Sequence, residues 1–221
     1  AGQMHGESAN ILLRLAENLQ TLAKQIEQFE DRYYNLEELA HIGQVINSSL
    51  DTQTVLQTVM DTIIRLTGAE RGFLMLREPD GEMSIQIARN WEQNSLDPSE
   101  FAISRTVIQR VLESGEAILT TNAQEDPRFG SQHSIIIYNL RSILCVPLKI
   151  KGQMIGVIYT DNRTHIGIFT EMHRELLSNF ANQAAIAIEN ARLFSSLRQT
   201  LAEVTELKNL MDNVFASITS G

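Results

Sequence analysis

The first 36 residues carry apolar side chains at alternating steps of three and four positions. These positions are Leu12, Leu15, Leu19, Leu22, Ile26, Phe29, Tyr33 and Leu36. Such spacing is a heptad repeat, which places one apolar stripe along a helix and favours packing against a second helix. The stripe covers about 37 Å of helix at 1.5 Å per residue. The pattern predicts a coiled-coil helix whose partner is a second copy of the chain; an amphipathic helix lying on its own domain is the alternative.

A second long helix is predicted near the C-terminal end, where residues 168–220 contain neither proline nor glycine. Thr170 is a suitable N-cap, and Glu171 follows in the first turn, where the helix dipole favours an acidic residue. We expect the dimer seam to continue along this helix. Its predicted positions there are Phe194, Leu197, Leu201 and Val204.

The centre of the chain holds the residues that break helices. All four prolines and eight of the twelve glycines lie between Gly68 and Gly167, which indicates a turn-rich domain. Hydrophobic periodicity and capping residues predict a helix over 52–67, strands over 72–78 and 82–90, a helix between Ser104 and Gly115, a strand over 117–121, a polar loop over 122–133 and a hairpin of strands 141–150 and 153–162. Adjacent hairpins with helices gathered at the ends indicate an α+β fold with an antiparallel sheet.

Composition and charge narrow the class of protein. The 221 residues have a net charge of −9, which argues against a nucleic-acid or anionic membrane partner. The sequence has one cysteine, so it forms no internal disulfide, and no apolar run is long enough to insert in a membrane. We therefore expect a cytoplasmic protein.

The residue types that carry catalysis do not occur in recognisable patterns. The sequence has no phosphate-binding Gly-Lys-Ser/Thr loop and no nucleophile motif. The five histidines include no pair four residues apart and no ligand cluster of the kind that zinc needs. We expect no enzyme activity and no metal site in this chain.

Four stretches together resemble a known family. These are LTGAERGFLML (66–76), NAQEDPRF (122–129), LRSILCVPLKIKGQMIGVIYTDN (140–162) and FTEMHRELLSNFANQAAIAIENARLF (169–194). In this order they resemble a GAF domain, a small-molecule-sensing and dimerising module of signalling proteins. The resemblance implies an antiparallel sheet of five or six strands, with the terminal helices on one face and a pocket on the other.

The resemblance also divides the chain. It implies an N-terminal coiled-coil helix over 1–38, a GAF-like sensory domain over 39–192 and a C-terminal signalling helix over 193–213. Residues 214–221 then resemble the opening of a further domain of the PAS type.

Three cofactors known in relatives are not expected here. Cyclic-nucleotide-binding members carry Asn-Lys, then Phe, then Asp-Glu. Asn162-Arg163 and Phe169 match this pattern in part, but His173 and Arg174 replace the acidic pair. Bilin-binding members carry a cysteine before the second hairpin, whereas Cys145 lies inside an apolar strand as a structural thiol. Relatives that bind haem use one histidine, for which His133 in the loop is the candidate. We expect no haem, and an unidentified small ligand remains possible.

A pocket on the sheet would need a few convergent polar groups. The candidates are Arg89, Ser104, Thr106, Asn122, Asp126, Arg128 and Arg141. Strand alternation would place Arg89 on the same face as Met83, Ile85 and Ile87. Alternatively, Asp126-Pro127-Arg128 forms a turn with a local salt bridge and Ser104 only caps its helix.

The resemblance implies a non-catalytic regulatory module. Such a module dimerises through its flanking helices and relays a signal to a downstream output domain, here a sensor histidine kinase of a two-component system. A dimerisation scaffold without a ligand, or the regulatory domain of a nucleotide or diguanylate cyclase, is the alternative. Relatives that reduce methionine sulfoxide need several cysteines, and this sequence has one.

Overall fold

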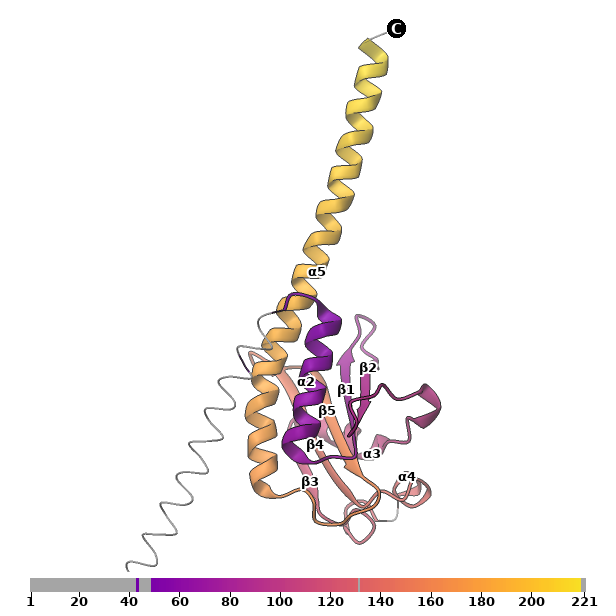
Figure 1. The fold of residues 1–221 in the computed structure, drawn as a ribbon, viewed down its shortest axis with the longest axis vertical. Helices are drawn as coiled ribbons and strands as arrows, with labels where there is room; N and C mark the ends of the chain where they lie inside the picture. The colour runs from indigo at the N-terminus through magenta and orange to yellow at the C-terminus, as the bar shows by residue number, and fades with distance from the viewer. Residues whose placement is uncertain (1–42, 44–48, 131, 220–221) are drawn as a thin grey trace, which may run out of the picture. The chain divides into compact units, whose positions relative to one another are not determined.

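The computed structural model describes residue 43, residues 49–130 and residues 132–219. The chain divides into two compact units, 1–42 and 43–221. The first unit, with the predicted seam from Leu12 to Leu36, lies outside the described residues. The second unit contains α2 (Thr52–Thr67), β1 (Arg71–Arg77), β2 (Met83–Asn90), the 3-10 helix η1 (Pro98–Glu100), α3 (Arg105–Ser114), β3 (Ile118–Thr120), α4 (His133–Ile137), β4 (Ser142–Ile150), β5 (Gln153–Asn162) and α5 (Glu171–Thr219) (Figure 1).

The five described strands form one sheet in the order β2-β1-β5-β4-β3, and every neighbouring pair is antiparallel. The central strand β5 has buried residues on both faces towards its end, from Gly156 to Asn162. The predicted α+β antiparallel fold is confirmed.

Helices α2 and the first half of α5 cover one face of the sheet (Figure 1). Asp51 begins α2 by accepting the Thr54 amide hydrogen bond at 2.8 Å, and Gly68 ends it in the left-handed conformation at φ 65°. The apolar face of α2 approaches β1 so closely that a Cβ on Gly72 would lie 2.3 Å from Cε of Met60. Alanines at the buried positions of α5 allow a similarly close approach of that helix.

The other face of the sheet carries α3, α4 and the β2–α3 connection. Phe73, Met75 and Tyr159 project from the sheet into a second core, which is closed by Val107 of α3 and Ile135 of α4. Ser104 caps α3 as predicted, and Gly115 ends it at φ 67°. The short helix α4 was not predicted, since its residues follow the polar loop without a helical repeat.

A β-bulge corrects the predicted face of Arg89. The β1–β2 register shifts between Leu74 and Met75, whose partners are Ile87 and Ile85. A bulge of this kind reverses the alternation on the strand that carries the extra residue. Arg89 is paired with Gly72, so it lies on the α2 face, whereas Ile85 packs against the core on the α3 face.

Helix α5 continues without interruption through 49 residues to Thr219. Its second half extends beyond the sheet (Figure 1). The predicted domain boundaries at 193 and 214 therefore fall inside one helix. None of the described helices is both long and apolar enough to cross a membrane.

Candidate functional site

A cavity of about 1320 Å³ lies on the face of the sheet opposite α2 and α5. Its walls come from β1, β2, α3, the start of α4 and residues 97–104, which we call the strap. The apolar part of the wall consists of Met75, Met83, Ile85, Phe101, Ile103, Ile108 and Leu112. Small-molecule sites are mostly apolar cavities with a few polar groups, whereas polar groups make up the larger part of the exposed wall of this cavity.

The polar part of the cavity gathers where α3 and α4 begin. Thr106 donates a hydrogen bond from Oγ1 to Oε1 of Gln132 at 3.2 Å, and His133 and Arg105 line the wall beside them. Arg77 lines the cavity from the end of β1. Within the described residues, neither Arg77 nor Arg105 has an ion-pair partner, so both guanidinium groups are available to an anionic group.

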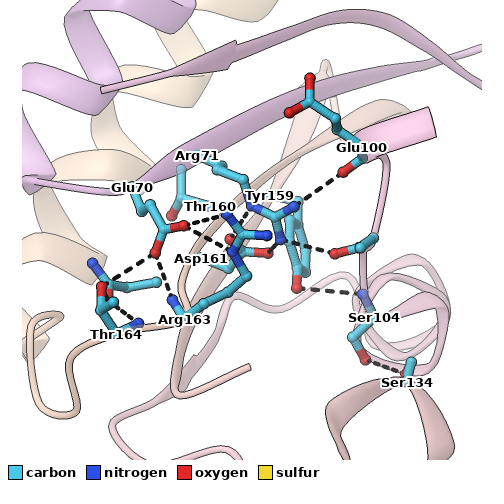
Figure 2. Close-up of polar contacts among 12 residues, drawn as sticks. Glu70, Arg71, Glu100, Ser104, Ser134, Tyr159, Thr160, Asp161, Arg163 and Thr164 are labelled. Atoms are coloured by element: carbon cyan, nitrogen blue, oxygen red, sulfur yellow. Dashed lines mark hydrogen bonds and ion pairs between the residues drawn. The ribbon is translucent and has the colours of Figure 1, made fainter. Parts of the chain in front are cut away.

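A buried arginine positions the strap over this cavity. Arg71, with 2% of its side chain exposed, forms a two-pronged contact with the fully buried Asp161: Nε to Oδ1 at 2.9 Å and Nη2 to Oδ2 at 2.7 Å. The same guanidinium donates to the backbone carbonyls of Glu100 at 3.1 Å and Ala102 at 2.8 Å. Figure 2 shows Arg71 between Asp161 on β5 and Glu100 on the strap.

The residue before Arg71 binds the loop that leads into α5. Glu70 accepts hydrogen bonds from the amide of Arg163 at 2.9 Å and from its Nε at 2.8 Å, and Thr164 donates from Oγ1 at 3.3 Å. Figure 2 shows Glu70 beside Arg163 and Thr164. Neighbouring residues at the start of β1 thus hold two different segments.

The pKa values of the two carboxyl groups of this cluster are shifted in opposite directions. Complete burial raises the pKa of Asp161 to about 6, although the Arg71 guanidinium opposes the rise. For Glu70, burial alone would also raise the pKa, but the hydrogen bonds from Arg163 more than offset it and the pKa lies below its usual value. Asp161 is therefore the carboxyl group closer to protonation at neutral pH.

Of the seven predicted pocket residues, Thr106 lines the cavity. Ser104 lies beneath it as a buried cap, accepting from the Val107 amide at 3.4 Å. Arg89 forms a two-pronged ion pair with Asp61 of α2, at 2.8 and 2.9 Å, on the opposite face of the sheet.

The remaining candidates lie around the β3–α4 loop, outside the cavity wall. Asp126 and Arg128 form the local salt bridge that was the alternative interpretation, at 2.7 Å, and Arg128 lowers the pKa of Asp126 to about 2. The backbone of Arg141 connects β5 to this loop through Asn162 and Ala123. Oδ1 of Asn122 is buried and accepts no hydrogen bond from any described residue.

The residues that sequence reasoning missed had weak local signals. Arg105 directly follows a correctly predicted cap, and Gln132 and His133 come together with it only because α4 folds back over α3. Arg71 and Asp161 are separated by 90 positions. A charged residue at the buried end of each apolar strand was a usable signal for this pair, since buried charges are normally paired.

His173 and Arg174 stand at the two positions where the cyclic-nucleotide motif has its acidic pair, and here they contact residues at the start of α5. Nδ1 of His173 accepts from the Thr170 amide and the His173 amide donates to Oγ1 of Thr170, both at 3.3 Å, so these residues cap α5. Arg174 forms an ion pair with Glu171 in the same turn. Oδ1 of Asn162 accepts from the amides of Thr164 and His165.

The two residues considered as cofactor ligands, His133 and Cys145, lie in different surroundings. His133 is exposed at the cavity wall, and no three His, Cys, Asp or Glu side chains gather as a metal site in the part of the chain that the structure describes. Cys145 is fully buried in the core, which raises the pKa of its thiol.

Comparison with known proteins agrees with this architecture. The chain is 33% identical over 101 residues to the probable 3',5'-cyclic phosphodiesterase pde-5 of Caenorhabditis elegans, covering 45% of this chain and 14% of that protein. It is 34% identical over 82 residues to hybrid signal transduction histidine kinase G of Dictyostelium discoideum, covering 37% and 2%. The chain spans about a quarter or less of the curated relatives that it matches.

The fold itself matches solved structures. The GAF domain from a phosphoenolpyruvate-protein phosphotransferase of Coxiella burnetii superposes with a TM-score of 0.55 at 20% identity, covering 73% of this chain and 96% of that one. The sequence model of the GAF domain matches residues 51–188. The chain therefore belongs to the GAF domain family, whose members are sensory and regulatory modules.

Proposed function

We propose that this chain is a sensory module that dimerises along α5 and relays the occupancy of its cavity to a downstream output domain, a histidine kinase. The observation that carries the proposal is the placement of two distinct surfaces. The cavity lies on one face of the sheet, and an exposed apolar stripe runs along the helix that covers the other face. Two histidine kinases among the relatives support this output domain.

The stripe on α5 repeats every seven residues. Its apolar members are Met172, Ile186, Leu193, Leu197, Val204, Leu207 and Met211, each between 49% and 64% exposed. They occupy two positions of one heptad, the spacing that two supercoiled helices require. Of the predicted seam, Leu197 and Val204 lie in the stripe, and Phe194 and Leu201 lie beside it.

The occupant that fits this stripe is the same stripe of a second copy. Asn190 falls at one of its heptad positions and is exposed, and a polar residue at such a position pairs with its equivalent and fixes the register of a parallel dimer. A parallel dimer brings both C-terminal ends of α5 to the same side. Paired output domains would then receive the same change in helix packing.

Dimerisation is tested by sedimentation at tens of micromolar. We expect a dimer for the unmodified protein and a dissociation constant at least about 100-fold weaker for Leu197→Asp with Val204→Asp, because two charges would be buried in the seam. The matched control is Ala202→Asp with Asn209→Asp, on the opposite side of the helix. A monomeric unmodified protein, or equal effects of the two double variants, would contradict the proposed dimer.

The cavity is tested with anilinonaphthalene sulfonate, an apolar body with one anionic group. We expect it to bind with a dissociation constant about tenfold weaker in Arg105→Glu, because a charge at the cavity wall changes sign. Arg65→Glu, on the exposed side of α2, is the control with the same change of charge. Equal binding by all three proteins would leave the scaffold alternative, a dimerisation module without a ligand.

A further inference from the structure

The cavity and α5 lie on opposite faces of the sheet, so any signal between them must pass through or around the strands. The described contacts offer one short route, at the end of the sheet where β1 begins and β5 ends. Glu70 and Arg71 lie there beside Asp161, Arg163 and Thr164 (Figure 2). The last two belong to the exit loop, which we define as residues 163–170 between β5 and α5.

Arg71 holds the strap. Its guanidinium provides the donors for two strap carbonyls, Glu100 and Ala102, and is itself fixed by both oxygens of Asp161. The strap contributes Phe101 and Ile103 to the cavity wall, and the Phe101 ring meets Phe73 edge to face at 5.8 Å. A ligand that moves the backbone of the strap strains or breaks the bonds to Arg71.

Glu70 holds the exit loop. Both of its carboxylate oxygens accept from Arg163, and one also accepts from Thr164. The same loop is fixed at its start by Asn162, whose Oδ1 accepts from the Thr164 amide at 2.9 Å and the His165 amide at 2.6 Å. Near the end of the loop, Phe169 is fully buried, two positions before α5 begins at Glu171.

The two contacts share a backbone. Glu70 and Arg71 are adjacent, the Glu70 amide donates to the Asp161 carbonyl at 3.1 Å, and Arg71 is the register partner of Asp161. A shift of Arg71 therefore moves Asp161 and Glu70. Glu70 itself binds the exit loop, and Asp161 directly precedes Asn162, which fixes the start of the loop. Backbone pairing inside a sheet is stiff, so the shift is transmitted rather than absorbed.

Resting on the sensory function proposed above, we propose that the Glu70–Arg71 dipeptide couples the strap at the cavity to the exit loop of α5. Spatial proximity alone does not establish coupling; the test is whether a change at one end alters the other. The coupling predicts that weakening either contact loosens both segments, although strap and loop share no hydrogen bond with each other.

Hydrogen exchange measured by mass spectrometry on the ligand-free protein tests this directly. Arg71→Lys retains the charge beside Asp161, but one ammonium cannot reproduce the fork that reaches a carboxylate and two carbonyls. We expect about tenfold faster exchange at the strap amides of Ala102 and Ser104, in line with the loss of charge-assisted hydrogen bonds. The coupling adds an increase of at least about threefold at Thr164 and His165.

Glu70→Gln is the reciprocal change. An amide nitrogen would then face the donors of Arg163, so we expect about tenfold faster exchange in the exit loop and at least about threefold in the strap. The matched controls are Arg89→Lys and Asp61→Asn, which weaken the equivalent ion pair between β2 and α2. We expect both controls to leave strap and loop within about twofold of the unmodified protein.

The coupling is overturned if each variant loosens only its own segment, or if the controls loosen strap and loop equally. If Arg71→Lys does not fold, Glu70→Gln alone tests the coupling, because the Glu70 side chain lies near the surface. Faster exchange in the strap of this variant would support the coupling, and unchanged exchange there would overturn it. These measurements involve neither a ligand nor the oligomeric state. An effect confined to one segment would therefore refute the coupling. It would not refute the proposed ligand cavity or the proposed dimer along α5, which are tested separately.

Discussion

Asp161→Asn separates two opposing effects on a buried ion pair. Asp161 is fully buried and both of its oxygens bind Arg71, so attraction favours its charged form while desolvation favours its neutral form. The structure favours desolvation, since burial raises the pKa from 3.8 to about 6. A rise of this size corresponds to about 3 kcal/mol. The asparagine resembles the protonated acid, but it leaves the buried Arg71 guanidinium without its counter-charge. We therefore expect the variant to be destabilised at both pH 4 and pH 7, and less so at pH 7.

The dependence on pH gives the sign of this effect. A carboxyl group with a raised folded-state pKa contributes stability that is complete below its unfolded pKa of 3.8 and is lost as pH rises through about 6. We therefore expect the free energy of unfolding of the unmodified protein, minus that of Asp161→Asn, to fall by about 2 kcal/mol between pH 4 and pH 7, where most but not all of the titration takes place. Urea denaturation followed by circular dichroism measures both proteins at each pH. A difference that instead grows with pH would show that attraction to Arg71 dominates and would refute the reasoning.

Three further predictions concern packing and exposure. Gly156→Ala should destabilise the fold by about 3 kcal/mol or more, because its Cβ would lie 2.1 Å from the Met75 carbonyl oxygen. Gly72→Ala should destabilise the fold less, since its Cβ meets the flexible end of the Met60 side chain. Urea denaturation of both variants measures the two losses of stability. Cys145 should react with a thiol reagent only at the rate of unfolding, because it is fully buried; rapid labelling of the folded protein would contradict this. The free energy of unfolding should fall as pH drops from 4 towards 2, because Arg128 lowers the pKa of Asp126 to about 2. In Arg128→Gln this loss of stability between pH 4 and pH 2 should be smaller.

Local signals predicted most of the fold. Asp51, Gly68 and Gly115 define helix ends through their own side chain or backbone conformation, so α2 and α3 were predicted correctly from neighbouring residues. Alternating and continuous apolar runs predicted the strands to within about a residue. The short helix α4 was missed because five residues show too little periodicity, and its stability comes from Ile135 packing in the core.

The site was harder to predict because it depends on pairing across the fold. The bulge in β2 has no glycine or proline to mark it, and it moved Arg89 to the α2 face. Arg71 and Asp161 meet because β1 and β5 are neighbours in the sheet, although Gln153–Asn162 lies far along the chain from Arg71–Arg77. Sequence periodicity predicts which face a residue occupies only where no bulge interrupts the strand, and strand order decides which charges meet on that face.

The parallel pairing of two α5 helices is tested most directly by distances between spin labels placed at Ala202→Cys and, separately, at Asn209→Cys. Both positions lie on the side of the helix away from the stripe, and the buried Cys145 is expected not to take up label. In a parallel dimer the two interprotomer distances are equal within the flexibility of the label. In an antiparallel dimer they differ by up to about 21 Å, twice the rise of seven helical residues. Equal distances would support the seam described above, and unequal distances or the absence of any dipolar coupling would contradict it.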